Sequence, residues 1–350
     1  MPKVCVIPGD GIGPEEVNEA LKVLDVVEAI YRPNIQLESL PYGADHYLET
    51  GETMPPGELD RIANHNDAVF LGALGDPRVP SNVHVRDILM GLRFHLDLYV
   101  NERPARLLDA RLTPLKGKGP ADIDLVIFRE NTEGLYVGMG GVFKHGMRDE
   151  IAIAEEVHTR HGVERIVRHA FERARGMGGV MVTMVDKANA VPAHMLWRRV
   201  FDDVGREYRD IPREALYADA VAHELVKRPE RFKVIVTNNF LGDLLSDLAA
   251  AIVGGLGVAP SANKHPGRHA LFHPVHGSVP QMANTDTANP IASIRSMAML
   301  LAHFGASDAA KAVHHAVRDA VAAGVTTSDL GGMRGTRDVG DWIADRIRLA

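Results

Sequence analysis

Short apolar runs alternate with longer amphipathic segments along the whole chain. Residues 4–8 form a continuous apolar run, whereas 14–31 repeats apolar side chains at helical spacing through Val17, Leu21 and Leu24. The predicted strands are 4–8, 68–71, 124–128, 180–185 and 233–237. The predicted helices are 14–31, 157–176, 244–253 and 291–304. This alternation predicts an α/β protein whose strands are mostly parallel.

Composition narrows the class of protein. The chain has 350 residues, which favours two domains. The stretches 75–82, 112–122, 137–148 and 257–268 are loop-rich, but none has the composition of a linker, so we expect the chain to cross between domains more than once. The formal charge of −7 argues against general nucleic-acid binding. The single cysteine excludes an internal disulfide and a cysteine-based metal site. No apolar run approaches the roughly 18 residues of a membrane span, so we expect a soluble, cytoplasmic protein.

Three arginines stand beside predicted strands or turns: Arg93, Arg103 and Arg129. The planar guanidinium suits a carboxylate or a phosphate. Each of them taken alone is better explained as a surface residue. Arg129 is the strongest candidate because it directly ends a predicted strand, where α/β enzymes bind ligands.

A second group of candidates is acidic. Asp243 and Asp247 are four residues apart after the predicted strand 233–237, so a helix there would place both carboxylates on one face. Such a pair suits Mg²⁺ or Mn²⁺, although an acid that complements a helix N-terminus and a solvated neighbour explain the spacing equally well. Asp219 is a possible third carboxylate. Lys187 follows an apolar run and is a candidate base, with a solvated surface lysine as the commoner alternative.

The glycine-rich turns exclude two nucleotide-binding types. Residues 8–14 contain GxGxG and not the GxGxxG of the Rossmann dinucleotide fold, and no GxxxxGK[ST] loop occurs. The segment 273–280 has free backbone donors that suit a phosphate. Zinc is not expected at His265, His269, His273 and His276, because glycine and proline between them prevent helical ligand spacing.

Taken together, these motifs resemble the β-decarboxylating dehydrogenase family, which includes isopropylmalate, isocitrate, homoisocitrate, tartrate and D-malate dehydrogenases. The resemblance covers essentially the whole chain and keeps the motifs in family order. They are Pro8-Gly-Asp-Gly-Ile-Gly-Pro14, Leu92-Arg93, Arg103-Pro104, Arg129-Glu-Asn-Thr-Glu-Gly-Leu-Tyr136, Asp186-Lys-Ala-Asn189, Asp219, Gly242-Asp-Leu-Leu-Ser-Asp247, Pro274-Val-His-Gly-Ser278, Ala288-Asn-Pro290 and Asp329-Leu-Gly-Gly332.

The resemblance implies an isopropylmalate dehydrogenase-like fold with two domains. A large domain, 1–99 and 251–350, would carry both termini and the cofactor loop. A small domain, 100–250, would carry the dimer interface and the metal-binding acids. The implied assembly is a homodimer with active sites shared between subunits, without nucleic-acid or membrane partners.

Residue roles follow from the same resemblance. Arg93, Arg103 and Arg129 would bind the carboxylates of a small hydroxy-dicarboxylate substrate. Asp243 and Asp247 would hold Mg²⁺ or Mn²⁺ together with Asp219 of the other subunit, and Asp219 would also face the substrate. Lys187, also from the other subunit, would help remove the hydroxyl proton, and Tyr136 would protonate the enol left by decarboxylation. The implied cofactor-binding residues are Ile12, Leu74, His276, Gly277, Ser278, Val279, Gln281 and Asn289.

The substrate expectation rests on the segment before Arg93. Leu89 and Met90 stand where isopropylmalate enzymes line the pocket for the isopropyl group. Isocitrate enzymes have Ser and Asn in this stretch, where Asp87 and Leu89 stand here, and neither would bind a third carboxylate. We therefore expect oxidative decarboxylation of 3-isopropylmalate to 2-oxoisocaproate, a step of leucine biosynthesis.

Departures from the family pattern leave alternatives open. Arg86 replaces a usual glutamate, His273 replaces another, and 129–134 is closer to isocitrate and tartrate enzymes. Tartrate or D-malate, and isocitrate or homoisocitrate, are the alternative substrates. Gln281 neither repels nor attracts a 2′-phosphate, so NAD is expected and NADP stays open. A catalytically silent regulatory subunit is the non-enzyme alternative, and a Mg²⁺-dependent phosphate-handling protein is disfavoured by the missing phosphate loop. The intact set Tyr136, Lys187, Asp219, Asp243 and Asp247 favours an enzyme.

Overall fold

The computed structural model describes residues 1–349 and divides into two compact units. Unit 1 comprises Met1–Leu98, Arg106–Pro120 and the chain from Ala250 onward, and unit 2 comprises Tyr99–Ala105 and Ala121–Ala249. The prediction placed residues 106–120 in the small domain, 100–250. This segment belongs to unit 1, where Arg111 Nη2 donates to the carbonyl of Val321 at 2.8 Å.

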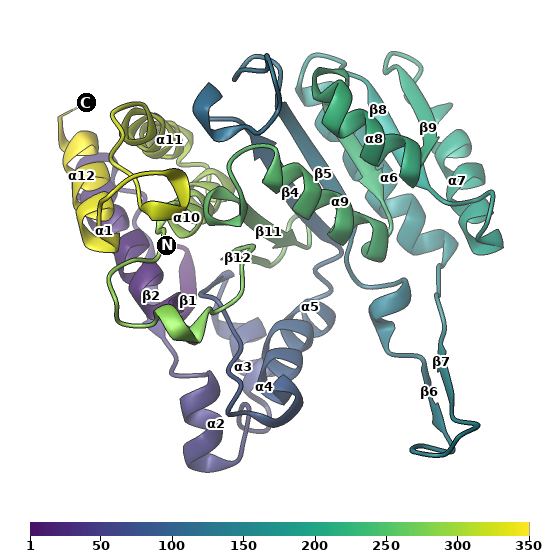
Figure 1. The fold of residues 1–350 in the computed structure, drawn as a ribbon, viewed down its shortest axis with the longest axis horizontal. Helices are drawn as coiled ribbons and strands as arrows, with labels where there is room; N and C mark the ends of the chain where they lie inside the picture. Colours follow the sequence, from purple (N-terminus) through teal and green to yellow (C-terminus); the bar gives the residue numbers. More distant parts are fainter. Residues whose placement is uncertain (350) are drawn as a thin grey trace. The chain divides into compact units, whose positions relative to one another are not determined.

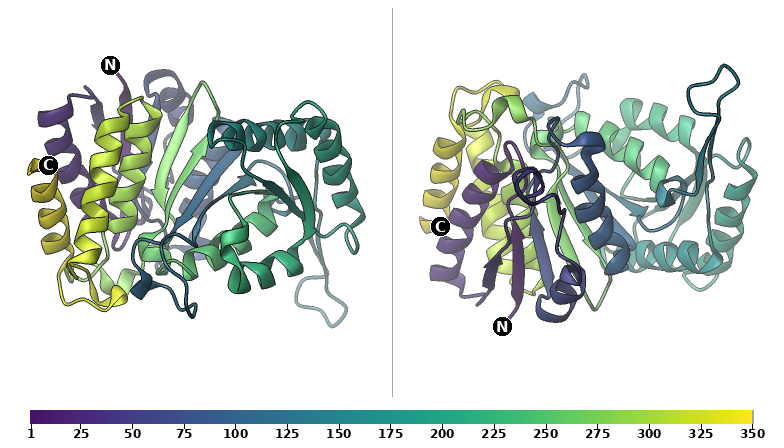
Figure 2. Two further views of the ribbon diagram at one scale, coloured as in Figure 1. Left: turned by 90° about the horizontal axis from the view of Figure 1, so that it is seen from above. Right: turned by 90° about the horizontal axis from the view of Figure 1, so that it is seen from below.

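Unit 1 contains five strands in the order β2 (Gln36–Ser39), β1 (Lys3–Ile7), β3 (Ala68–Leu71), β12 (Ala270–Pro274) and β11 (Pro260–Lys264). The first four are parallel, and β11 runs antiparallel to β12. Four long helices pack against one another beside these strands, as Figure 2 shows: α1 (Gly13–Tyr31), α10 (Ile291–His303), α11 (Ser307–Ala322) and α12 (Thr336–Arg348). The shorter helices are α2 (Ala44–Thr50), α3 (Glu58–His65), α4 (Val83–Val85) and α5 (Gly91–His95).

Unit 2 also has five strands, in the order β4 (Val100–Arg106), β5 (Asp124–Glu130), β10 (Val234–Thr237), β8 (Val182–Asp186) and β9 (Arg213–Tyr217). The last four are parallel. Its helices are α6 (Arg160–Gly176), α7 (Met195–Gly205), α8 (Ala218–Lys227) and α9 (Asn239–Ala251). The core is mostly aliphatic, and within it Phe171 stacks on both Phe201 and Tyr208.

A hairpin of β6 (Gly140–Phe143) and β7 (Ile151–Ala154) extends from the rest of unit 2 (Figure 1). Every residue of both strands is exposed, including Val142, Phe143, Ile151 and Ile153. A two-stranded ribbon with apolar side chains in water is marginally stable by itself.

The short turns complete the element list. The 3₁₀ turns are Pro80–Asn82, Ala110–Leu112, Leu135–Val137, Pro192–His194, Pro229–Arg231, Leu256–Val258, Pro280–Met282 and Ser328–Leu330. A π turn occupies Arg86–Met90. Within residues 1–349, no helix has both the length and the apolar character needed to cross a membrane.

All predicted strands and helices are present, with ends shifted by a few residues, and the α/β class is confirmed. Two of the stretches expected to be loops contain strands. Strand β11 lies within 257–268 and β6 within 137–148. The sequence of β11, Pro-Ser-Ala-Asn-Lys, has no strand pattern, and its pairing with β12 makes it a strand.

Candidate active site

Arg129 and Asp243 meet at the carboxyl ends of two neighbouring strands of unit 2. Arg129 lies on β5 opposite Thr237 of β10, and α9 begins two residues after β10 ends. The Arg129 side chain is 2% exposed, its Nε donates to Asn239 Oδ1 at 2.8 Å, and its Nη1 forms an ion pair with Asp243. A Cβ on Gly242 would lie 2.7 Å from Arg129 Cβ. Glycine at 242 therefore allows α9 to pass this close to Arg129.

Tyr136 shares the same carboxylate. Its hydroxyl donates to Asp243 Oδ2 at 3.0 Å, and its ring lies 5.5 Å from the Arg129 guanidinium. Burial, followed by the charge of Asp243, raises the pKa of the Tyr136 phenol. The phenol is therefore held in its protonated form beside the ion pair.

Arg103 on β4 is the second buried arginine of this unit. Its Nε donates to Asn101 Oδ1 at 2.7 Å, whereas its Nη1 is buried and has no hydrogen-bond partner among residues 1–349. Burial, followed by the nearby charge of Arg129, lowers the pKa of Arg103 to about 10. A buried guanidinium with an unused donor is a strong site for a carboxylate, because leaving the donor unsatisfied costs about 1–3 kcal/mol.

Asp243 and Asp247 supply the oxygen ligands that a divalent cation requires. They stand one turn apart on α9, and Asp247 is exposed there. Partial loss of solvent raises the pKa of Asp247, although the charge of Arg103 acts in the opposite direction. A carboxylate whose charged form is disfavoured next to a second carboxylate gains from a bound cation. The donor set therefore fits Mg²⁺ or Mn²⁺.

Lys187 and Asp219 form a separate pair in unit 2. Lys187 Nζ lies 2.7 Å from Asp219 Oδ1, and this hydrogen bond lowers the pKa of Asp219. Lys187 follows β8, and Asp219 lies in the first turn of α8 with most of its side chain exposed. The described part of one chain does not gather Asp219, Asp243 and Asp247 into one three-ligand group.

The remaining predicted substrate residues belong to unit 1. Leu89 and Met90 lie in the π turn that leads into α5, and Arg93 is buried on α5 with its Nη1 3.7 Å from Met90 Sδ. The three predicted arginines are thus divided, with two in unit 2 and one in unit 1.

The predicted cofactor residues also belong to unit 1, where one loop collects most of them. Ile12 N donates to the carbonyl of Ser278 at 2.8 Å, and the Ser278 hydroxyl donates to the carbonyl of Gly75, the neighbour of Leu74. The loop contains Gly277, and its left-handed residue Val279 (φ 38°) precedes the turn Pro280–Met282, where Gln281 is exposed. Asn289 donates to Asp329 Oδ2 at 2.9 Å.

His276 secures this loop to the first turn of α1. Its Nε2 lies 3.0 Å from Glu16 Oε2. Burial disfavours the charged imidazole, but the contact with Glu16 outweighs it and raises the pKa of His276. The glycine-rich turn 8–14 therefore packs against the loop at 276–279. A Cβ on Gly11 would lie 2.0 Å from the carbonyl oxygen of Ser278.

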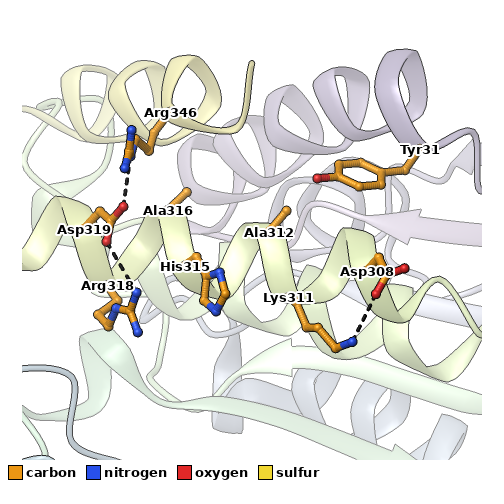
Figure 3. Close-up of a pocket in the computed structure, with 9 residues that line it drawn as sticks. All are labelled: Tyr31, Asp308, Lys311, Ala312, His315, Ala316, Arg318, Asp319 and Arg346. Atoms are coloured by element: carbon orange, nitrogen blue, oxygen red, sulfur yellow. Dashed lines mark hydrogen bonds and ion pairs between the residues drawn. The ribbon is translucent and has the colours of Figure 1, made fainter. Parts of the chain in front are cut away.

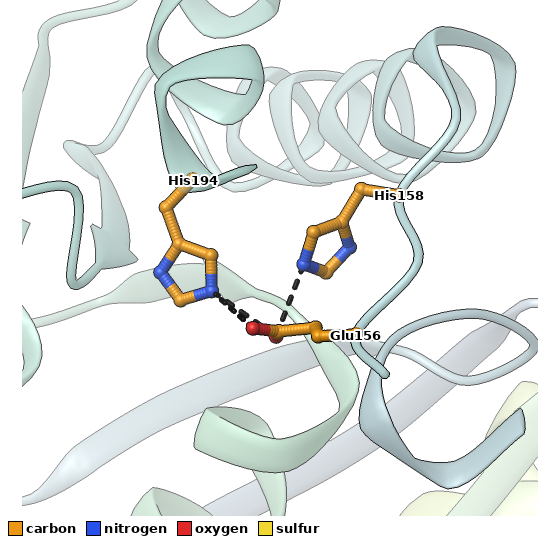
Figure 4. Close-up of side chains that lie close together, drawn as sticks. All are labelled: Glu156, His158 and His194. Carbon is orange, nitrogen blue, oxygen red and sulfur yellow. Dashed lines mark hydrogen bonds and ion pairs between the residues drawn. The ribbon is translucent and has the colours of Figure 1, made fainter. Parts of the chain in front are cut away.

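Sequence reasoning missed a cluster of Glu156, His158 and His194 in unit 2 (Figure 4). His194 Nε2 lies 3.1 Å from both carboxylate oxygens of Glu156, and His158 Nε2 lies 3.0 Å from Oε1. Glu156 and His158 are near neighbours in the sequence, but His194 lies far from both, and neither spacing nor periodicity joins the three. A shallow hollow lined by α11, together with Tyr31 and Arg346, contains none of the predicted site residues (Figure 3). Its Lys311 and Arg346 are paired with Asp308 and Asp319.

Comparison with known proteins gives a consistent result. A family model described as isocitrate/isopropylmalate dehydrogenase matches residues 3–343. The chain is 43% identical over 348 residues to a 3-isopropylmalate dehydrogenase of Thermobifida fusca, covering 99% of this chain and 97% of that protein. It is 45% identical over 348 residues to a protein of the same name from Beutenbergia cavernae, covering 98% of each. The crystal structure of an isocitrate dehydrogenase from Methylococcus capsulatus superimposes with a TM-score of 0.89 at 37% identity, covering 99% of this chain and 100% of that one.

Proposed function

The chain belongs to the isocitrate/isopropylmalate dehydrogenase family, and on that premise we propose that it oxidatively decarboxylates 3-isopropylmalate to 2-oxoisocaproate with NAD. The observation that carries the proposal is the arrangement in unit 2. Two buried arginines, two carboxylates on one face of α9 and a protonated phenol come together there. Such a site can bind an acid, hold a cation and supply a proton.

The arginines would bind the substrate carboxylates. Arg103 has an unused buried donor, and Arg129 is held in place by Asn239. Charge-assisted hydrogen bonds from a fixed guanidinium orient a carboxylate as well as bind it. We assign Arg93 of unit 1 to the same substrate. Leu89 and Met90 in that unit favour an isopropyl group over a third carboxylate.

Asp243 and Asp247 would hold Mg²⁺ or Mn²⁺, with Asp219 from a second subunit. A divalent cation bound there supplies Lewis-acid stabilisation of the negative charge that develops on the substrate oxygen at C2. Asp243 also accepts from Tyr136 and Arg129, which keeps its carboxylate oriented.

Tyr136 would be the general acid. Its phenol is protonated and exposed enough to reach a bound molecule, because 37% of the residue is accessible. After carbon dioxide leaves, the enol carbon needs a proton, and the Tyr136 hydroxyl would donate it. Lys187 would act earlier, by taking the proton of the C2 hydroxyl.

We propose a homodimer in which Lys187 and Asp219 serve the active site of the partner. Two observations support this assembly. The Lys187–Asp219 pair is separate from the Asp243 and Asp247 pair within one chain, and the exposed β6–β7 hairpin presents apolar side chains. A second copy of the chain would bury that hairpin.

The loop at 276–289, with Ile12 and Leu74, would bind NAD. NAD, when bound, accepts the hydride released as C2 is oxidised. Gln281 supplies no charge to attract a 2′-phosphate, which favours NAD over NADP.

The test is a panel of 3-isopropylmalate, D-malate, tartrate, isocitrate and homoisocitrate, each with NAD or NADP and with or without Mn²⁺. Reduction of NAD with 3-isopropylmalate at the highest kcat/KM supports the proposal. Isocitrate is the second candidate, because the superimposed crystal structure is named for it. A higher kcat/KM with any other acid overturns the substrate assignment, and no reduction in any mixture favours a regulatory subunit.

A further inference from the structure

The side chain of His194 closes the loop that carries Lys187. The backbone N–H of Lys187 donates to His194 Nδ1 at 2.8 Å. The carbonyl of Lys187 accepts from the N–H groups of Ala190 and Val191. The eight-residue segment 187–194 is therefore tied back to its own first residue, and the position of the Lys187 backbone depends on the His194 ring.

The other edge of the ring faces Glu156. The contacts with His158 and His194 lower the pKa of Glu156 to about 2, so this residue is a carboxylate that only accepts hydrogen bonds. Since Nδ1 accepts from Lys187, a neutral His194 carries its proton on Nε2 and donates it to Glu156. The ring is buried, and Figure 4 shows its contact with Glu156, while Lys187 holds the opposite ring nitrogen.

This tautomer argues against a metal site. The ligand atoms of Glu156, His158 and His194 lie within 4.8 Å of one another, a spacing that suits an ion. A metal on Nε2 would require the proton to move to Nδ1, where it would face the N–H of Lys187. Two donors would then oppose each other over 2.8 Å. The hydrogen-bond pattern is that of a positioning network.

We propose that His194 is a positioning residue for Lys187, with Glu156 fixing the tautomer of its ring. This inference rests on the catalytic role proposed for Lys187. The Lys187 side chain reaches Asp219 from a backbone whose place His194 sets. A displacement of about 1 Å at a reacting group can cost about 10²-fold in rate, so loss of this hydrogen bond should lower kcat.

Glu156 also contacts the start of α9. Asn238 Nδ2 lies 3.1 Å from Glu156 Oε1, and Asn238 Oδ1 accepts from Leu241 N in the first turn of the helix. Asn238 Nδ2 is also 2.9 Å from His194 Nε2. The neutral ring has its only free lone pair on Nδ1, so the amide group of Asn238 donates to the carboxylate of Glu156 and not to the ring. Replacement of Glu156 should therefore disturb the helix of Asp243 as well, whereas replacement of His194 acts on Lys187.

Two substitutions separate the two ring nitrogens. His194→Asn places an amide oxygen near the position of Nδ1 and keeps an acceptor for Lys187. His194→Gln reaches toward Glu156 and removes that acceptor. We expect H194Q to lower kcat by about tenfold or more with the substrate KM within about threefold, and H194N to retain kcat within about threefold. His158→Asn is the matched control. His158 is as buried as His194 and also contacts Glu156, but its contact is not with Lys187.

A double-mutant cycle tests whether the effect passes through Lys187. In a Lys187→Met background, H194Q should lower the remaining kcat by less than about twofold, because the group that His194 positions is gone. Equal losses in both backgrounds would overturn the proposal, as would wild-type kcat in H194Q or equal kcat in H194N and H194Q.

An activity-free measurement keeps this test distinct from the test of the proposed function. In ¹⁵N-histidine-labelled protein, the resonances lost in H194N should show an unprotonated Nδ1 and a protonated Nε2. The opposite tautomer, or stoichiometric Zn²⁺ binding that H194N abolishes, overturns the positioning network whatever the enzyme oxidises. If the tautomer holds and wild-type protein reduces NAD but Lys187→Met has full kcat, the role of Lys187 fails and this inference fails with it.

Discussion

The Tyr136 hydroxyl donates to Asp243 Oδ2 over 3.0 Å, while the other oxygen of that carboxylate pairs with Arg129. One aspartate therefore connects the proposed proton donor, the proposed substrate arginine and the proposed metal site. The bond also fixes the phenol in its protonated form, since a phenolate would lie against a carboxylate.

Tyr136→Phe removes the transferable proton and keeps the ring against Arg129. We expect kcat to fall by about 10²–10⁴, with KM for the substrate changed little, because the lost group acts in the chemical step. Steady-state kinetics measures kcat and KM. Mass spectrometry of the product formed in D₂O measures the proton added to the enol carbon. Tyr208→Phe is the matched control, because it removes a hydroxyl bonded to Glu172 elsewhere in unit 2. A turnover equal to that of wild type in Y136F would remove Tyr136 from the mechanism.

Arg103→Lys retains a positive charge but loses the planar fork. The unused Nη1 donor of Arg103 is the group that we assign to a substrate carboxylate. Replacing a charge-assisted bidentate contact by a point charge should raise KM by about 10–100-fold, equivalent to about 1.4–2.7 kcal/mol. Arg168→Lys, on a surface arginine paired with Glu164 and Glu207, should leave KM unchanged. An unaltered KM in R103K would show that the substrate binds elsewhere.

Asp247→Asn removes one of the two charges that face the proposed cation. Residues that only hydrogen-bond to metal ligands contribute about 10–100-fold to metal affinity. Loss of a direct ligand should therefore lower the Mn²⁺ affinity by at least as much. Titration of Mn²⁺ by electron paramagnetic resonance measures the affinity without turnover, and EDTA treatment should abolish wild-type activity until Mn²⁺ or Mg²⁺ is restored. Asp203→Asn, which alters an exposed acid paired with Arg160, is the control. Equal Mn²⁺ affinity in D247N and wild type would move the metal away from α9.

Local pattern predicted part of this site and could not predict the rest. The spacing of Asp243 and Asp247 indicates a shared helical face, and Arg129 ends an apolar run, so both could be found from the sequence. The anchoring of Arg129 by Asn239 depends on β5 and β10 lying side by side, and they are separated by about a hundred residues. The tie between Lys187 and His194 depends on a loop conformation that no periodicity describes.

The fold shows the same division between local and long-range information. Helices α1, α6 and α10 were predicted within a few residues of their ends, whereas α11 and α12 were not predicted. Strand β11 is short and mostly polar, and only its pairing with β12 makes it a strand. Segment 106–120 belongs to unit 1 through contacts that local pattern does not show, such as the bond from Arg111 to Val321, about two hundred positions later.

Gly11→Ala tests the proposed cofactor loop. The added Cβ would lie 2.0 Å from the Ser278 carbonyl oxygen, at a residue with φ of 58°. We expect KM for NAD to rise at least tenfold, because the turn at 8–14 can no longer pack on the loop that we assign to NAD. Gly51→Ala is a close control, because Gly51 has a φ of 76° and no atom lies within 4 Å of the new Cβ. It therefore introduces the backbone strain of about 1–2 kcal/mol without a steric clash. Equal KM for NAD in both variants would contradict the assignment.

His314 on α11 predicts a pH dependence of stability that is independent of catalysis. Burial, followed by the charge of Arg295, lowers its pKa to about 4. In the unfolded chain the pKa would be near 6.5, so above that pH the residue is neutral in both states and contributes no pH dependence. As the pH falls from about 6.5 toward 4, the unfolded chain binds the proton first and the free energy of unfolding decreases. The loss of unfolding free energy is at most about 3 kcal/mol at ~1.4 kcal/mol per pKa unit, and smaller where water reaches the ring.

His314→Gln should reduce the change of the urea midpoint of unfolding with pH over this range. His161→Gln, at an exposed histidine in the first turn of α6, should follow wild type, and an unchanged slope in H314Q would contradict the prediction.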